Sequence, residues 1–237
     1  MRDASFFPLS EDEELVITAD CAGAIGEKQY DEINVSYDVL AYASLRVTLM
    51  ECLAVGGRPF AVIVQNFVNG PVWRTFEKSV TQICRELKIP ILPIMGSSET
   101  NFSMLQSAVG FTVIGKAARS KRRIAVTPPG AGFAVIGRPL VGDEVISQKN
   151  DAASLTLFKQ LCHMDGIYEL VPVGSKGIAS ELTGLFSDNH LNISEWSCKL
   201  DTEKSAGPST CFIISYQKSR EPEIKKAAGT LFYKIKT

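Results

Sequence analysis

Four acidic side chains stand out because of where the hydrophobic pattern places them. Asp20 directly follows an apolar run that predicts a strand, and Glu99 lies in a polar turn after another short strand. Glu51 lies in a predicted helix and Asp3 near the N-terminus. Mg²⁺ prefers hard oxygen ligands and commonly joins one or two protein carboxylates to phosphates. Acids that met in one cleft would suit such a site, whereas each acid taken singly is more often a solvated or capping residue.

The elements that must position these acids alternate between strands and helices. In the first half the pattern predicts helices at about 36–55 and 73–87, and strands at 15–19, 61–67, 91–95, 108–116 and 124–127. Gly56 and Gly57, with Pro59 shortly after, end the first helix, since glycine accepts left-handed dihedral angles and proline cannot continue a helix. The segment 20–31 is predicted as an acidic, glycine-containing loop, and 96–101 as a polar turn.

The second half repeats the alternation, with helices predicted at 152–164, 178–186 and 223–228 and strands at 169–173, 192–196 and 210–216. Mixed strands and helices in both halves indicate an α/β or α+β class. Pro128 and Pro129, followed by Gly130 and Gly132, mark the best candidate boundary. We therefore expect two domains, residues 1–127 and residues 128–237.

Composition narrows the function classes. The 237 residues are 45% hydrophobic and 22% charged, which is ordinary for a globular protein. The 25 basic and 26 acidic residues nearly cancel, which disfavours a nucleic-acid binder. Six scattered cysteines form no C-x-x-C pair, so neither a zinc site nor a disulfide framework is indicated. No secretory signal or apolar run of about 18 residues is present, so we expect a cytoplasmic protein without a membrane partner.

Three segments, 14–26, 47–59 and 89–100, together resemble the aminoimidazole ribonucleotide synthetase (AIR synthase, PurM-like) superfamily. That group includes thiamine monophosphate kinase, selenophosphate synthetase, a hydrogenase maturation protein and α-ribazole kinase. The resemblance covers nearly the whole chain. It implies a two-lobed PurM-like fold with mixed sheets flanked by helices. It also implies an N-terminal ATP- and Mg²⁺-binding domain, a C-terminal AIR synthase-like domain, and a homodimer formed by pairing of the N-terminal lobes.

The resemblance also implies site residues in the N-terminal half. The magnesium ligands would be Asp3, Asp20, Glu51 and Glu99. The ATP-binding residues would be Asp3, Asp20, Gly26, Gly96, Ser97, Ser98 and Thr100. The chain departs from the family pattern in three places: Arg2 precedes Asp3 where relatives have glycine and aspartate, Glu51 replaces an aspartate, and Ser97-Ser98 lengthens the turn.

Two glycine-containing segments of the C-terminal half are candidates for binding a phosphate or the substrate. In the first, Gly174, Ser175, Lys176 and Gly177 precede a predicted helix, whose N-terminal N–H groups and dipole favour anions. In the second, Lys204, Ser205 and Gly207 precede the last core strand, where relatives have substrate-side residues. Each segment could equally be an ordinary cap or turn.

Among the superfamily members, the best match is α-ribazole kinase, which phosphorylates a benzimidazole riboside in cobamide lower-ligand salvage. The opening R-D-x-x-x-x-P-L and the segment D-x-x-G-x-I-G carry that likeness. The prediction is an ATP- and Mg²⁺-dependent small-molecule kinase acting on a riboside, with no general base assigned. Three alternatives stay open: a thiamine monophosphate kinase-like enzyme, a ring-closing ligase, or a non-catalytic nucleotide-sensing module. The tail lacks the terminal cysteine used by the hydrogenase maturation relative, and the N-terminus is too short for selenium chemistry.

Overall fold

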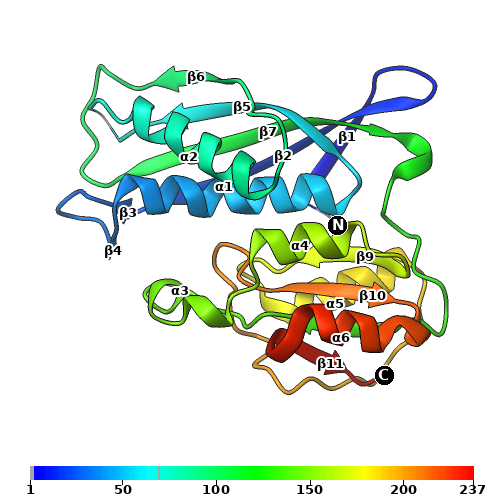
Figure 1. Cartoon of the computed structure of the whole chain (residues 1–237). Coiled ribbons are helices and arrows are strands. Elements are labelled where there is room, and N and C mark those ends of the chain that lie inside the picture. Colours follow the sequence, from blue (N-terminus) through cyan, green and yellow to red (C-terminus); the bar gives the residue numbers. More distant parts are fainter. Residues whose placement is uncertain (1–2, 69) are drawn as a thin grey trace. The chain divides into compact units, whose positions relative to one another are not determined.

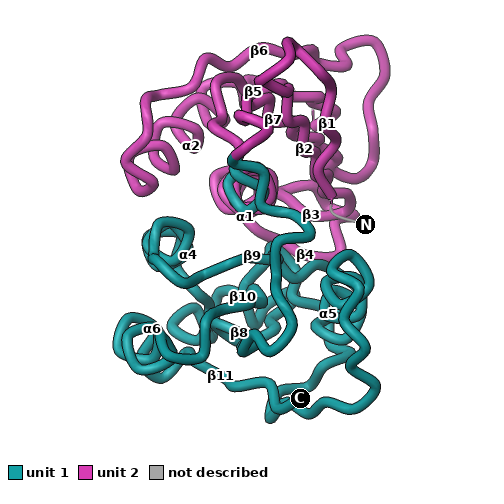
Figure 2. Tube along the Cα trace, turned by 90° about the vertical axis from the view of Figure 1, so that its right-hand side faces the viewer, with its two compact units in different colours: residues 1–2, 53–56, 121–237 teal, residues 3–52, 57–120 magenta. Residues whose placement is uncertain are grey.

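The structure is a computed structural model that describes residues 3–68 and 70–237. Arg2, part of the predicted first motif, lies outside the described residues. The chain folds into two compact units, coloured in Figure 2. Of the described residues, 3–52 and 57–120 belong to unit 2, and 53–56 and 121–237 belong to unit 1. The chain passes from unit 2 to unit 1 between Ser120 and Lys121. The predicted boundary between an N-terminal ATP-binding domain and a C-terminal domain at residue 127 stays a prediction.

Unit 2 holds a five-stranded sheet in the order β1-β2-β7-β5-β6, and a small parallel pair, β3 and β4. All neighbours in the larger sheet are antiparallel except β5 and β6, which are parallel and joined by a crossover through α2. The bounds are β1 (Ala4–Pro8), β2 (Glu13–Gly23), β3 (Ile25–Gly26), β4 (Ile33–Asn34), α1 (Tyr37–Ala54), β5 (Arg58–Asn66), α2 (Trp73–Glu86), β6 (Ile94–Ser98) and β7 (Ala108–Ala118).

Helices α1 and α2 cover one face of this sheet (Figure 1). Thr18 on β2 donates a hydrogen bond to the Thr48 carbonyl of α1 at 2.8 Å, and Phe76 of α2 packs edge-on against Phe111 of β7. Helix α1 ends as predicted: Gly56 adopts φ +88°, and the Gly57 N–H bonds back to the Cys52 carbonyl. These contacts fix α1 to β2 and α2 to β7.

Unit 1 holds an antiparallel four-stranded sheet in the order β11-β8-β10-β9. Phe133 and Val135 of β8 face α5, whereas Phe212 of β10 faces α4, so helices cover both sides of the sheet. The bounds are β8 (Gly132–Ile136), α3 (Glu144–Ser147), α4 (Leu155–Cys162), β9 (Ile167–Pro172), α5 (Gly177–Asp188), β10 (Phe212–Tyr216), α6 (Glu221–Ala228) and β11 (Phe232–Ile235).

The predicted fold class is confirmed, but several elements were wrong in place or kind. Residues 124–127 form no strand, because the N–H groups of Val126 and Thr127 donate to the Glu169 carboxylate instead of a strand ladder. Residues 192–196 also form no strand; only the isolated Ser197–Lys236 bridge follows them. Asp20 lies inside β2 and not after it, and residues 96–98, predicted as part of a turn, belong to β6.

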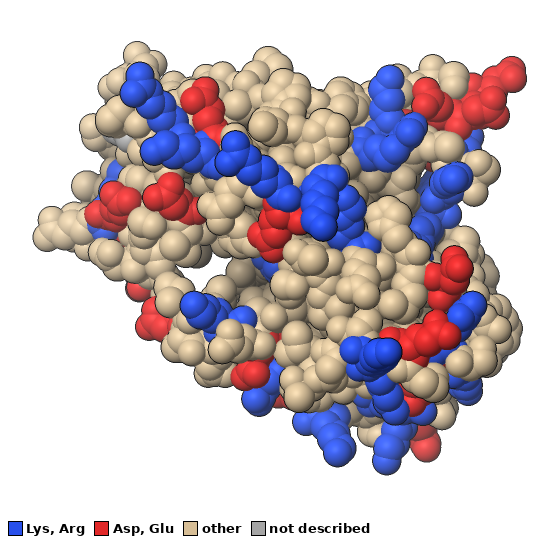
Figure 3. Space-filling view, in the orientation of Figure 1, with Lys and Arg blue, Asp and Glu red and all other residues tan. Residues whose placement is uncertain are grey.

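The charged side chains on the face drawn in Figure 3 include both signs. On the face shown in Figure 3, Lys and Arg side chains are interspersed with Asp and Glu. This agrees with the formal net charge of -1. Within the described residues, no helix combines the length and the apolar character needed to cross a membrane.

Candidate functional site

Asp20 is the best-placed of the predicted acids. The alternation of β2 directs its side chain to the helix-covered face of the sheet, on the same side as Thr18. There the Ser44 hydroxyl of α1 and the Cys21 backbone N–H donate hydrogen bonds to its carboxylate. Burial outweighs these hydrogen bonds and raises the pKa of Asp20 to about 6. A carboxylate kept partly out of water with so few donors is suited to a cation.

The face of α1 that lies against β2 carries a line of polar residues. Ser44, Thr48 and Glu51 recur at i, i+4 and i+7, which places them on one side of the helix. Seven residues of helix correspond to about 10 Å along the axis, so Glu51 lies roughly that far from the point where Ser44 meets Asp20. On this spacing Glu51 lies on the same side of α1 as Ser44 but is not a direct neighbour of Asp20. Burial, followed by the charge of Glu51, raises the pKa of the adjacent Cys52 to about 12.

Ser44 and Thr48 were missed by sequence reasoning. The signal was present, because a polar residue every third or fourth position in an otherwise apolar helix indicates a polar contact along one face. Both are buried, with exposed fractions of 3% and 0%. Buried hydroxyls must be hydrogen-bonded, and Thr48 donates to carbonyls of its own helix, 3.1 Å from that of Leu45.

Glu99 lies directly after β6, and its carboxylate is already engaged. Oε1 accepts hydrogen bonds from the N–H groups of Asn101 at 2.6 Å and Phe102 at 3.2 Å, and these bonds lower the pKa of Glu99. The Glu99 N–H donates to the Asn66 carbonyl of β5, while the Asn66 amide donates to Ser98 Oγ. The carboxylate therefore shapes its own loop, and a metal ion would have to use the other oxygen or compete for this one.

Across the residues that the structure describes, no three His, Cys, Asp or Glu side chains gather closely enough to hold a metal ion. Asp3 is exposed at the start of the chain, Glu99 is committed to its loop, Asp20 lies on β2 and Glu51 lies on α1. The oxygen donors nevertheless fit Mg²⁺ chemically, because this ion commonly takes only one or two protein carboxylates and completes its shell with phosphates and water. Asp20 is the residue that would hold it; the full set of four stays a prediction.

Gly96 is fixed by close packing of β6 against β5. A Cβ atom on Gly96 would stand 1.9 Å from the Val64 carbonyl oxygen. The oxygen belongs to the backbone and the Cβ position is fixed by the Gly96 backbone, so no side-chain rotation can relieve the contact. Gly96 therefore has a structural role in the pairing of β5 with β6, and its role in ATP binding stays a prediction.

We expect Gly96→Ala to push β6 away from β5 and to lower the free energy of unfolding by more than about 2 kcal/mol. Urea denaturation followed by circular dichroism measures this. Gly23→Ala is the matched control, because a Cβ on Gly23 at the end of β2 would meet nothing within 4 Å. Equal stability of the two variants would contradict the close packing.

The first C-terminal candidate segment lies where predicted, at the start of α5. Gly177 adopts φ +78°, and a Cβ there would stand 2.7 Å from the Thr202 carbonyl oxygen. That carbonyl accepts the N–H of Ala179 in the first turn of the helix at 2.9 Å. One of the N–H groups that could bind an anion at this helix end is therefore already bonded to Thr202. Ser175 and Lys176 are exposed.

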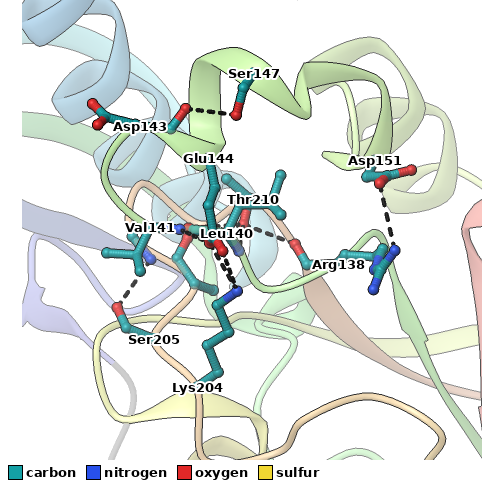
Figure 4. A network of polar contacts seen from close by, with 12 residues as sticks. Arg138, Leu140, Val141, Asp143, Glu144, Ser147, Asp151, Lys204, Ser205 and Thr210 are labelled. Carbon is teal, nitrogen blue, oxygen red and sulfur yellow. Dashed lines mark hydrogen bonds and ion pairs between the residues drawn. The ribbon is translucent and has the colours of Figure 1, made fainter.

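The second candidate segment is tied to the loop around α3 (Figure 4). The Lys204 ammonium lies 2.8 Å from both carboxylate oxygens of Glu144. This contact, together with the Val141 N–H, holds the pKa of Glu144 below its usual range. Ser205 Oγ accepts the N–H of Gly207, and a Cβ on Gly207 would stand 2.8 Å from the Leu140 carbonyl oxygen. Lys204 is paired in this structure, so a phosphate would have to displace Glu144.

An open pocket of about 440 Å³ lies elsewhere in unit 1. Its walls come from the start of β8, the segment after α5 and Lys218, and they include Phe133, Leu191, Ile193 and Glu195. None of the predicted site residues lines it, so we assign it no part in the candidate site.

The buried polar centre of unit 1 was also missed by sequence reasoning. Glu169, fully buried on β9, accepts hydrogen bonds from the Thr127 hydroxyl at 2.6 Å and from two backbone N–H groups. Ser215 of β10 contacts the same hydroxyl at 2.6 Å and the Asn189 side chain accepts the Thr127 N–H. This network fixes the first residues of unit 1 to its sheet and explains why 124–127 cannot be a strand.

No protein-family model and no curated protein matches the sequence. Solved structures do match. "T. maritima PurL complexed with ADP" is 11% identical with a TM-score of 0.60, and the match covers 99% of this chain and 42% of that chain. The chain spans less than half the length of that PurL chain. The chain has the PurM-like fold.

Two further structures are matched over most of their own length. Thiamine-monophosphate kinase from Stenotrophomonas maltophilia is 14% identical, with a TM-score of 0.62 and coverage of 95% of this chain and 82% of that chain. "AaThiL complexed with AMPPCP and TMP" is 12% identical, with a TM-score of 0.62 and coverage of 99% and 83%. At this identity the likeness establishes the fold, and the two-lobed, helix-flanked architecture expected from the sequence is confirmed.

Proposed function

We propose that this protein is an ATP- and Mg²⁺-dependent enzyme that transfers the terminal phosphoryl group of ATP to a small molecule. The observation that carries the proposal is Asp20: a predicted metal ligand that lies on a strand of a PurM-like fold, half-hidden against α1, with its pKa raised by burial. Support also comes from the matched structures, which include a complex with ADP, a complex with the ATP analogue AMPPCP and a kinase.

In this proposal Asp20 would hold a magnesium ion that supplies charge neutralisation at the nucleotide phosphates. Phosphoryl transfer depends mainly on positioning and electrostatic stabilisation, so the chain's own residues act by orienting ATP and excluding water. Lys176 and Lys204 are candidates for the phosphate or substrate side, Lys204 after release from Glu144. The acceptor we favour is a benzimidazole riboside, as in α-ribazole kinase, which rests on the sequence likeness.

Product analysis tests the reaction. The protein is incubated with Mg-ATP and a panel of acceptors that includes α-ribazole, other ribosides and thiamine monophosphate, and products are identified by mass spectrometry. ADP with a phosphorylated riboside supports the proposed kinase. ADP with inorganic phosphate and a cyclised product indicates a ring-closing synthetase. Absence of Mg-ATP binding in calorimetry would overturn the proposal in every form.

A non-catalytic nucleotide-binding module is the second candidate. It is favoured by one observation: the Glu99 carboxylate is held by the backbone of its own loop, which leaves the described residues without a clustered acid site. This candidate predicts stoichiometric binding of Mg-ATP without ADP formation on any acceptor of the panel.

We further propose a homodimer formed through the face of the unit 2 sheet that α1 and α2 do not cover. On this face the strand register aligns Ile17 with Ile114 and Ile114 with Ala61. At its margins Phe7 and Met95 are 50% and 65% exposed. A contiguous apolar sheet face open to water is typical of a protein interface.

We expect Ile114→Glu to convert the dimer to monomers. The new carboxylate would be buried in the dimer interface without a cation, and the two-fold axis would bring the same carboxylate of the second subunit to this interface. Sedimentation velocity over a concentration series measures this as a rise in the dissociation constant of at least about tenfold. Arg85→Glu is the control, because it adds a carboxylate at an exposed position of α2, away from the uncovered face of the sheet. A wild-type protein that is monomeric at every concentration would contradict the proposal.

A further inference from the structure

Two loops of unit 2 that lie far apart in the sequence are cross-linked by hydrogen bonds. One is 24–36, which follows β2, and the other is 99–107, which joins β6 to β7. Lys28 Nζ donates to the carbonyls of Met104 at 2.9 Å and Gln106 at 3.3 Å, and Gln106 Nε2 donates to the Tyr30 carbonyl at 2.7 Å. The two loops are therefore held together by side chains of each loop that donate to main-chain carbonyls of the other.

Asp31 is the centre of this contact. Its Oδ1 accepts the Ser107 N–H at 2.7 Å, and its Oδ2 accepts the Ser107 hydroxyl at 2.7 Å and the Lys28 N–H at 2.9 Å. Slight burial acts to raise the pKa of Asp31, but the hydrogen bonds from Ser107 and Lys28 outweigh it and lower the pKa. The ionised carboxylate of Asp31 is therefore the form that these hydrogen bonds stabilise. We call Lys28, Asp31, Tyr37, Gln106 and Ser107 the loop clasp.

The loop clasp closes directly over Gly26. A Cβ on Gly26 would stand 2.5 Å from Ser107 Oγ and 2.8 Å from the Tyr37 ring. The Tyr37 hydroxyl lies 3.1 Å from the same Ser107 oxygen, and Ser107 is only 1% exposed. The position of Gly26 is therefore set by side chains from the start of α1 and from the end of loop 99–107, and not only by its own loop.

Both clasped loops carry residues expected to bind ATP. Loop 24–36 contains Gly26 and begins one residue after β2, the strand of Asp20, and loop 99–107 begins with Glu99 and Thr100. Surface loops are mobile unless they are tied down, and a misplacement of about 1 Å can cost a catalytic site about 100-fold. A nucleotide bound by both loops would benefit from their being fixed in advance.

We propose that Asp31, acting through Ser107, is a positioning residue that holds these two loops in the geometry required to bind the nucleotide. The inference rests on the proposed function, because it concerns the same ATP site. The Asp31 carboxylate already accepts hydrogen bonds from three protein donors and would not contact the nucleotide. Its effect would be on the affinity for ATP more than on the chemical step.

Asp31→Asn and Ser107→Ala test the proposal, with Glu32→Gln as the matched control. Glu32 is the exposed neighbour of Asp31, so the control removes one charge from the same loop but leaves the loop clasp intact. Asp31→Asn turns one acceptor oxygen into an NH₂ group that faces other donors. Ser107→Ala removes only the hydroxyl and keeps the backbone N–H bond to Oδ1, so its effect should be smaller.

For Asp31→Asn we expect the dissociation constant and the KM for Mg-ATP to rise at least about tenfold, with a smaller change in kcat. Amide hydrogen exchange of Ser107 and Lys28 should accelerate, while that of β2 and α1 stays unchanged. Ser107→Ala should lie between Asp31→Asn and the wild type, and Glu32→Gln should match the wild type.

An unchanged KM in Asp31→Asn, with exchange at Ser107 accelerated, would overturn the positioning role and leave the proposed function standing. A uniform loss of protection across unit 2 would also overturn it, because Asp31 would then support the whole fold. A wild-type protein that binds no Mg-ATP would overturn the proposed function and the positioning role together. Calorimetry on the wild type therefore separates failure of the function from failure of this inference.

Discussion

Replacing Asp20 by Asn is expected to lower Mg-ATP turnover by at least about 100-fold without unfolding the protein. The amide keeps the size of the side chain and can still accept from Ser44, but it removes the negative charge that would hold a divalent ion. Steady-state ADP formation measures the loss, and calorimetry measures the accompanying loss of Mg-ATP affinity. Asp12→Asn, an exposed acid just before the same strand, is the control and should retain full activity.

The same variant makes a stability prediction with a definite sign. The pKa of Asp20 rises from 3.8 to about 6 in the folded protein, so the folded state holds its proton longer than the unfolded state. The free energy of unfolding therefore falls as pH rises from 3.8 to 6 and stays lower above that range. Without Mg²⁺, Asp20→Asn should be the more stable protein near pH 8, by at most about 3 kcal/mol, and equal to the wild type well below pH 4.

Added Mg-ATP should stabilise the wild type and not Asp20→Asn, because only the carboxylate gains a cation. Thermal unfolding curves of both proteins, recorded at two pH values with and without Mg-ATP, measure the stabilisation. Full activity in Asp20→Asn, or equal stabilisation of both proteins by Mg-ATP, would remove Asp20 from the site.

Glu169→Ala is expected to produce the largest loss of stability, about 3 to 5 kcal/mol. The carboxylate accepts the Thr127 hydroxyl and the N–H groups of Val126 and Thr127, and all of this is buried against Ser215. Removing it leaves buried donors without an acceptor and opens a cavity beside β9, the edge strand of the unit 1 sheet. Equilibrium urea unfolding measures the loss.

Glu169→Gln is the matched variant, because its amide oxygen can still accept the Thr127 hydroxyl. We expect it to cost less than half as much as Glu169→Ala. Thr127→Val, which removes only that hydroxyl, should fall between the two. If Glu169→Ala unfolds at the same urea concentration as the wild type, the buried network does not stabilise unit 1.

Much of the architecture was predictable because local signals agreed with the final packing. The glycine pair at 56–57 ended α1, and apolar runs marked β5, β7, β9 and β10. The misses have physical causes. The segment 192–196 has strand-like alternation, and Ile193 and Trp196 do pack on the core of unit 1, but a strand also requires a partner backbone. That requirement is set by tertiary structure and cannot be derived from a pattern of period two.

The candidate site divides in the same way. Asp20 could be chosen from the sequence because an acid in an apolar strand is conspicuous, yet its Ser44 partner and raised pKa depend on how α1 lies on β2. Asp31 gave no signal, since an acid in a polar loop is commonplace, and its partner Ser107 is 76 residues away. Glu99 was identified from its motif, but its bonds to Asn101 and Phe102 could be seen only in three dimensions.

The long pairing of β2 with β7 sets a constraint on how unit 2 comes to be folded. The two strands are joined along eleven positions, from Glu13 with Ala118 to Gly23 with Ala108. During synthesis β2 must wait until Ala118 has left the ribosome before this neighbour is available. Until then β2 has only β1 as a strand partner. Nascent chains stalled before residue 118 therefore expose an unpaired strand edge to which chaperones can bind.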